Sequence, residues 1–197
     1  RFWGNNRVMI NCQKEVDNME FNQTKTFANL KAAYAGESQA RVKYAIYAKQ
    51  AEKQGYKQIS CLFNETAENE QAHARVWFTY LRGGTIPDTC GALEDSAGDE
   101  LFEHSKMYPD FAKQAREEGF EDIAARFELV AKVEAEHEKR FRKLAENMKN
   151  QTVFKREAPI LWICQECGHV HFGAQAPEQC PICSYPQAYF KEKAQNY

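Results

Sequence analysis

The chain lacks a surplus of either charge, because its 197 residues include 26 Lys and Arg against 28 Asp and Glu, a formal net charge of −2. A basic surplus would be needed to hold the phosphates of nucleic acid or of an anionic membrane, so we expect neither partner. The sequence also has no apolar run near the roughly 20 residues that span a bilayer. It has no glycine-rich dinucleotide fingerprint and no secretory signal at its start, so we expect a cytoplasmic protein.

Most of the chain has a helix-forming composition. Residues 22–149 are rich in Ala, Glu, Lys, Gln and Leu, which favour helix. Glycines break this pattern, and Pro109 predicts a kink or break. The expected helices span 24–53, 57–81, 91–117 and 121–149. Short turns within each pair and a longer connection between the pairs predict two antiparallel hairpins and a mainly α, four-helix bundle.

The helical region repeats itself. The segment Ala48–Ile59 recurs 64 residues later as Ala112–Ile123, with the same Ala-Lys-Gln-Ala start and the same glycine position. Upstream the alignment slips by one residue, so that Glu37 matches Glu100. Matching glycines and matching Glu/His pairs favour a duplicated hairpin over chance similarity. Two copies packed about a pseudo-twofold axis would form the bundle.

Glutamate and histidine recur at metal-ligand spacing in both copies. Two Glu-x-x-His motifs each place a carboxylate and an imidazole one turn apart on a helix face. Carboxylate and imidazole suit Fe or Mn, and di-iron bundles combine two such motifs with one Glu from each of two other helices. A lone Glu-x-x-His usually faces solvent, but here apolar stripes flank the acids, and buried acids need a partner. The six candidate ligands from this pattern are Glu37, Glu70, His73, Glu100, Glu134 and His137, and Glu103 shares a helix face with Glu100. His104 is expected at the surface.

Four of the seven cysteines form two Cys-x-x-Cys pairs near the C-terminus. This spacing predicts a four-thiolate metal site in a reducing compartment rather than a disulfide framework. The pattern is strong for a metal but leaves zinc and a single iron open. The four expected ligands are Cys164, Cys167, Cys180 and Cys183. Neighbouring aromatic side chains are expected to shield the site: Trp162, Phe172, Tyr185, Tyr189 and Phe190.

Changes in composition divide the chain into four parts. Residues 1–18 are polar and aperiodic and are expected to lie outside the core fold. Residues 19–149 form the predicted bundle, and 150–159, ending in Ala-Pro, a linker. Residues 160–197 form a small β domain, whose size usually requires a metal for folding.

Several segments together resemble the rubrerythrin family. They are Ala35–Arg41, Glu65–Ala67, Met107–Pro109, Glu138–Phe141, and the Cys-x-x-Cys-Gly-x-x-His and Cys-Pro-x-Cys motifs of the last domain. The resemblance covers residues 24–193. It implies a ferritin-like di-iron bundle followed by a rubredoxin-like domain with one iron in the four-cysteine site. One departure is Ser184, where stand-alone rubredoxins usually have glycine.

The resemblance also implies roles for the candidate ligands. One iron would be held by Glu37, Glu70, Glu134 and, when oxidised, Glu103, which His73 replaces on reduction. The second would be held by Glu100 and His137, with Glu70 and Glu134 bridging. Tyr44 and Tyr108 match tyrosines that hydrogen-bond the iron-bound carboxylates.

The implied activity is reduction of hydrogen peroxide to water in oxidative-stress defence. Electrons would come through the four-cysteine iron from NAD(P)H, by way of a separate reductase or rubredoxin. The family further implies a head-to-tail homodimer, with helices exchanged between subunits in some members. Two alternatives remain at this point: a ferritin-like protein that binds or oxidises iron and carries a structural zinc ribbon, and an oxygen-activating oxidase.

Overall fold

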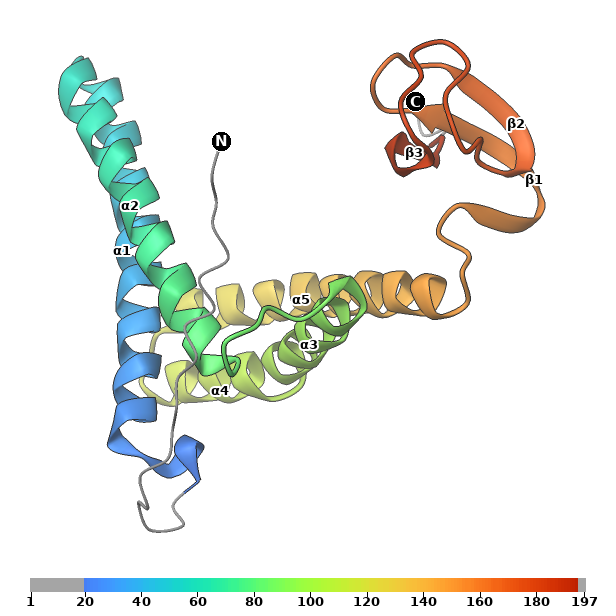
Figure 1. Cartoon of the computed structure of the whole chain (residues 1–197). Coiled ribbons are helices and arrows are strands. Elements are labelled where there is room, and N and C mark those ends of the chain that lie inside the picture. The colour runs from blue at the N-terminus through green and yellow to red at the C-terminus, as the bar shows by residue number, and fades with distance from the viewer. Residues whose placement is uncertain (1–19, 195–197) are drawn as a thin grey trace, which may run out of the picture. The chain divides into compact units, whose positions relative to one another are not determined.

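The computed structural model describes residues 20–194, and the chain divides between Ile86 and Pro87 into two compact units. Within the described residues the chain is mainly helical, with four long helical segments followed by a small three-stranded sheet (Figure 1). The expected fold class is thus confirmed. The predicted extension, residues 1–18, lies outside the described part. No helix in the described part is long and apolar enough to cross a membrane.

The first unit is a helical hairpin. A short 3-10 turn, η1 (Phe21–Gln23), precedes α1 (Lys25–Lys53), and α2 (Lys57–Leu81) follows it. Gly55 takes a positive φ of 85° at the end of α1, a conformation that suits glycine and reverses the chain. The two helices lie side by side (Figure 1). Small side chains let them approach closely, and the buried ones are Ala48, Ala51, Ser60, Ala67 and Ala74.

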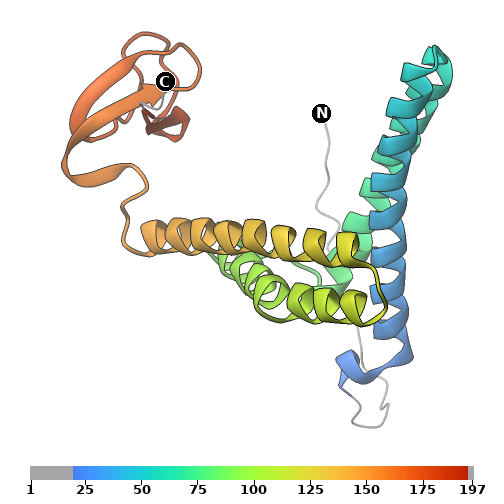
Figure 2. The same ribbon diagram turned by 180° about the vertical axis from the view of Figure 1, so that it is seen from behind.

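The second unit contains a matching helical hairpin. Its first arm is α3 (Thr89–Phe102), a π-helical turn η2 (Glu103–Met107) and α4 (Tyr108–Glu117); its second arm is α5 (Glu121–Lys149). Figure 2 shows α5 running beside α3 and α4. The buried residues include Ala112, Ala115 and Ala124. These are the residues 64 positions after Ala48, Ala51 and Ser60, so the duplication reaches the packed interface.

The π-helical turn differs from the kink expected at Pro109. The amide of Tyr108 donates to the carbonyl of Glu103, five residues back, instead of the usual four. Proline lacks an amide hydrogen and is tolerated in the first turn of a helix, and Pro109 is the second residue of α4. A π turn inserts one residue into a helix. The segment therefore continues as a helix instead of breaking.

This inserted residue explains the slip in the sequence repeat. Glu37 and Tyr44 are seven residues apart in the continuous helix α1, whereas Glu100 and Tyr108 are eight apart across η2. The additional residue in the π turn keeps the second pair on one helix face, as the first pair is in α1.

The last domain is an antiparallel sheet with strand order β2-β1-β3. Its strands are β1 (Lys155–Cys164), β2 (Val170–Gln175) and β3 (Phe190–Glu192). Trp162 is fully buried in the core, and its indole Nε1 donates to the carbonyl of Gly173 at 2.9 Å. Strand β1 begins within residues 150–159, which we expected to form a linker, so half of that segment belongs to the sheet.

Candidate metal centres

The first unit brings together one of the two predicted carboxylate–histidine groups. Ligand atoms of Glu37 on α1 and of Glu70 and His73 on α2 all lie within 4.8 Å of one another. His73 Nδ1 is 2.9 Å from Glu70 Oε2 and 3.8 Å from Glu37 Oε1. Because Nδ1 faces both acids, it is the ring atom that can coordinate the same cation as the two carboxylates.

The second unit contains the matching group. Ligand atoms of Glu100 on α3 and of Glu134 and His137 on α5 also lie within 4.8 Å of one another. His137 Nδ1 is 2.7 Å from Glu134 Oε2 and 3.6 Å from Glu100 Oε1. The two groups therefore share their residue types, helix spacing and ring atom, as the sequence repeat predicts. The duplication reproduces a site geometry as well as a sequence.

Burial and mutual repulsion act together on the acids near the second group. Burial and the charge of Glu134 raise the pKa of Glu100, an effect that the proximity of His137 partly opposes. Burial and the charges of Glu134 and Asp99 raise the pKa of Glu103. Partly buried carboxylates that repel one another are the environment in which a divalent cation binds favourably. The residues present therefore fit a hard metal ion such as iron.

Tyr108 lies near these acids. Burial and the nearby charges of Glu103, Glu134 and Glu100 raise the pKa of its phenol. The phenol thus keeps its proton and can donate a hydrogen bond to a carboxylate. Its counterpart in the repeat, Tyr44, packs in the first unit with its ring 6.1 Å from that of Phe63.

The four predicted cysteine ligands converge in the sheet domain. Their sulfur atoms all lie within 4.8 Å of one another, with Cys164–Cys183 at 3.7 Å and Cys167–Cys180 at 3.6 Å. A tetrahedral metal with bonds of about 2.3 Å separates its sulfurs by about 3.8 Å, whereas a disulfide would need roughly 2.05 Å. Burial opposes ionisation of the Cys180 thiol, but the amides of Cys183 and Ile182 lower its pKa to about 7, whereas burial and the neighbouring thiols raise the pKa of Cys183 to about 12. The sulfurs are thus arranged as metal ligands.

Comparison with known proteins assigns both the helical part and the sheet domain to one family. Residues 28–87 and 92–161 match the rubrerythrin family model, and residues 162–191 match the rubrerythrin rubredoxin-like domain. The chain belongs to the rubrerythrin family. Rubrerythrin-1 of Clostridium acetobutylicum is 44% identical over 189 residues, covering 88% of this chain and 97% of that protein.

Two further rubrerythrins are comparably similar. That of Porphyromonas gingivalis is 43% identical over 196 residues, covering 94% of this chain and 98% of that protein. That of Nitratidesulfovibrio vulgaris is 45% identical over 179 residues, covering 85% and 94%. Family membership makes the chain a non-haem iron oxidoreductase of oxidative-stress metabolism, with a di-iron site and a rubredoxin-like domain. The two carboxylate–histidine groups and the four-cysteine group fit these cofactors.

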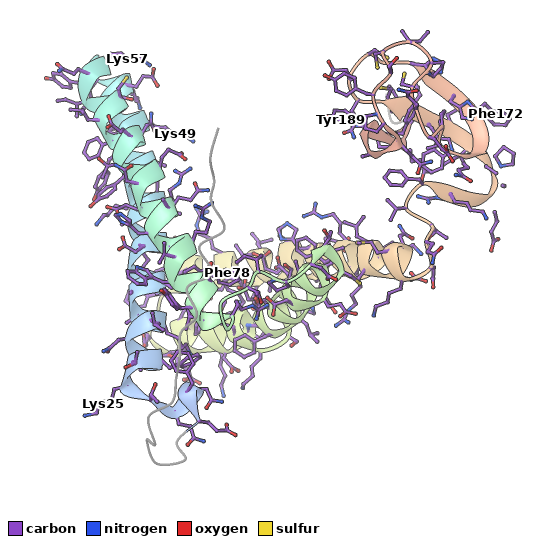
Figure 3. The ribbon with its side chains drawn as sticks, in the orientation of Figure 1. Lys25, Lys49, Lys57, Phe78, Phe172 and Tyr189 are labelled. Atoms are coloured by element: carbon purple, nitrogen blue, oxygen red, sulfur yellow. The ribbon has the colours of Figure 1, made fainter. Side chains whose placement is uncertain are left out.

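The aromatic shield of the rubredoxin-like domain is smaller than expected. Trp162 and Phe190 are buried, but Phe172 on β2 is 68% exposed and Tyr189 is also exposed (Figure 3). Phe172 is exposed because neighbouring residues of β2 point to opposite faces of the sheet. Ser184 takes a φ of 60°, the left-handed region that a glycine would occupy without a steric cost.

His104 is a residue that the sequence analysis misplaced. We expected it at the surface, but its side chain is only 21% exposed, and its Nε2 lies 2.7 Å from Glu138 Oε2. The prediction was wrong because it assumed a regular helix, whereas His104 lies within the π turn. Arg142 and His104 together lower the pKa of Glu138 by hydrogen bonding. A three-residue polar chain therefore links η2 to α5.

Proposed function

We propose that this chain reduces hydrogen peroxide to two waters at its di-iron site, using electrons that pass through the four-cysteine iron. The observation that carries the proposal is that one chain contains two matching carboxylate–histidine groups together with a four-thiolate site. The first two supply ligands for a pair of irons, and the third supplies a one-electron carrier. Simple iron storage needs no electron carrier of its own.

The proposed iron ligands are the residues of the two matching groups together with Glu103, namely Glu37, Glu70, His73, Glu100, Glu103, Glu134 and His137. When bound, the two irons supply the two electrons that cleave the peroxide O–O bond. The chain's own residues determine the charge around the irons and hold protons near them. A carboxylate-rich ligand set favours the oxidised irons, and Glu103 adds one more carboxylate near Glu134.

Two tyrosines are proposed to orient the iron-bound carboxylates. The support for Tyr108 is its phenol, which keeps its proton beside Glu103, Glu134 and Glu100. For Tyr44 the support is its place in the repeat, 64 residues before Tyr108. A fixed hydrogen-bond donor would hold a carboxylate in one geometry while the charge on the site changes.

The electron supply involves other proteins. We propose a separate NAD(P)H-linked reductase or a rubredoxin as donor, since the sequence has no dinucleotide fingerprint of its own. Four thiolates need a compartment that keeps cysteine reduced, which suits the cytoplasm. We propose a head-to-tail homodimer in which the rubredoxin-like domain of one subunit delivers electrons to the di-iron site of the other. Exchange of helices between the subunits would place the two matching groups of one site on different chains.

Rapid mixing tests the proposed reaction. Fully iron-loaded, chemically reduced protein is mixed with hydrogen peroxide and, separately, with dissolved oxygen at equal concentration, while the return of the oxidised absorbance is followed. We expect reoxidation by peroxide to be faster by about a hundredfold or more, the size of effect that favourable positioning at two metals can supply.

The same experiment distinguishes the alternatives. Oxygen rates equal to or above the peroxide rates would contradict the proposal and favour an oxygen-activating or ferroxidase activity. Metal analysis adds a second check, because zinc instead of iron in the four-cysteine site of protein made with both metals available would remove the proposed electron carrier.

A further inference from the structure

The π-helical turn η2 has an unusual position, because it begins at Glu103 and ends one residue before Tyr108. A π turn has a poorer hydrogen-bond geometry than an α turn, and it persists only when its surroundings favour it. If the turn became regular α-helix, the residues on its two sides would rotate relative to one another by about 100°, the angle of one residue. Glu103 and Tyr108 could not then face the same acids.

Contacts made within the turn itself are local and exposed. Lys106 Nζ pairs with Asp110 Oδ2 at 3.1 Å, and both side chains are more than 60% exposed. Ser105 Oγ donates to the carbonyl of Leu101 at 2.6 Å, a bond within the same helical segment. Neither contact connects the turn to another helix, so neither selects a π turn over an α turn by tertiary packing.

His104 makes the connection that these residues lack. Its Nε2 lies 2.7 Å from Glu138 Oε2 on α5, 34 residues away in the chain, and both side chains are partly buried, at 21% and 14% exposed. The other carboxylate oxygen of Glu138 accepts from Arg142 Nε, which fixes its orientation. A charge-assisted bond between partly buried groups is stronger than an exposed pair of the same kind.

We propose that His104 is a positioning residue, which holds the π-helical turn against α5 through Glu138 and thereby fixes Glu103 on the side of Glu134. The role rests on the proposed function only where it concerns Glu103 as an iron ligand. His104 itself does not touch substrate or iron. Its contribution is to select the helical register that gives the site its additional carboxylate.

The first test needs no metal and no activity. Hydrogen exchange of the backbone amides of residues 104–108 is measured on the full-length, metal-free chain. We expect His104→Ala to raise their exchange rates by about tenfold, since opening of a local segment follows the loss of its tertiary contact. His104→Gln keeps an N–H that can reach Glu138 and should restore most of the protection. Lys106→Ala, the matched control in the same turn, should leave it unchanged.

The second test asks whether the turn positions Glu103. Mössbauer spectra of the oxidised, iron-loaded protein are compared for wild type, Glu103→Gln, His104→Ala and His104→Gln. We expect His104→Ala to show the altered iron signal of Glu103→Gln, and His104→Gln to resemble wild type. Unchanged amide exchange in His104→Ala, or faster exchange with a wild-type spectrum, would overturn the proposal. Neither readout uses peroxide, so a failure of the proposed reaction would be seen separately.

Discussion

At the residue scale, the duplication is the reason that the acidic site could be predicted. Glu70 and Glu134 occupy equivalent positions in the repeat, and each has a histidine one turn later. A motif that arose by chance on the surface would not be expected to recur at the equivalent position of a second hairpin. The structure brings each Glu/His pair together with the expected single glutamate, Glu37 or Glu100. Spacing along a helix is a local property, so it can be read from the sequence.

His104 shows which residues could not be predicted in this way. Its partner, Glu138, lies 34 residues away, on another helix. Their contact depends on the backbone register of the π turn, which shifts the direction of His104 relative to a regular helix. A residue whose role depends on tertiary contact and on an irregular turn leaves no periodic signal. The one-residue slip of the repeat was the available hint.

The role of the Tyr108 hydroxyl can be tested by a single substitution. Tyr108→Phe removes a protonated phenol beside three glutamates while keeping the ring that packs 5.9 Å from Phe127. We expect unchanged iron content and reoxidation by peroxide slowed by about tenfold, the effect of losing one hydrogen bond to a charged group. Stopped-flow absorbance measures the rate. The control is Tyr47→Phe, an exposed tyrosine of α1 that should react at the wild-type rate. A wild-type rate for Tyr108→Phe would show that its hydroxyl has no role.

At the element scale, helix ends were predictable and the path of one helix was not. The second and fourth expected helices agree with α2 and α5 to the residue. Glycines with positive φ mark the turns before both helices and after α2, whereas the turn after α5 has Gln151 in this conformation. Pro109 predicts a kink or break, although it is the second residue of α4, which continues the helix after a π turn. Composition reports where a helix stops. It does not indicate which backbone carbonyl accepts the hydrogen bond of each amide, and so it does not distinguish an α turn from a π turn.

The hydrophobic core of the rubredoxin-like domain includes two of its metal ligands. Cys164 and Cys180 are each 1% exposed and pack with Trp162 and Phe190. Removing a thiolate therefore affects both the metal and the packing of this domain. The helical units have their own buried residues, so we expect them to keep their iron.

Cys180→Ser tests this separation. The red absorbance of thiolate-bound iron should disappear, and iron content should fall from about three to about two per chain. Chemically reduced protein should still be reoxidised by peroxide, whereas turnover with a reductase should be lost. Cys61→Ser changes an exposed cysteine of α2 and should leave all of these properties unchanged. Loss of all three irons in Cys180→Ser would show that the domains depend on one another for folding.

At the scale of the whole molecule, each helical unit leaves apolar side chains uncovered in the single chain. Val42, Ile46 and Leu62 of the first unit are 55–59% exposed, and Leu129 and Val133 of the second are 60% and 50% exposed. Side chains of this size are costly to leave in water when they gather on helix faces. The homodimers usual in this family would give such side chains a surface to pack against.

Complementing variants decide how the dimer builds its di-iron sites. One chain carries Glu70→Ala and His73→Ala, the other Glu134→Ala and His137→Ala, so each lacks one of the two carboxylate–histidine groups. Neither variant alone should retain di-iron sites. If subunits exchange hairpins, a mixed dimer joins the two intact groups at one of its sites. Random pairing then restores about one quarter of the wild-type sites, because half of the dimers are mixed and each has one good site of two. We expect this recovery when the two variants are co-expressed, measured as bound di-iron and peroxide-reoxidation amplitude. If each site is built from a single chain, every site lacks one group, and no recovery will be seen at any ratio of the two variants.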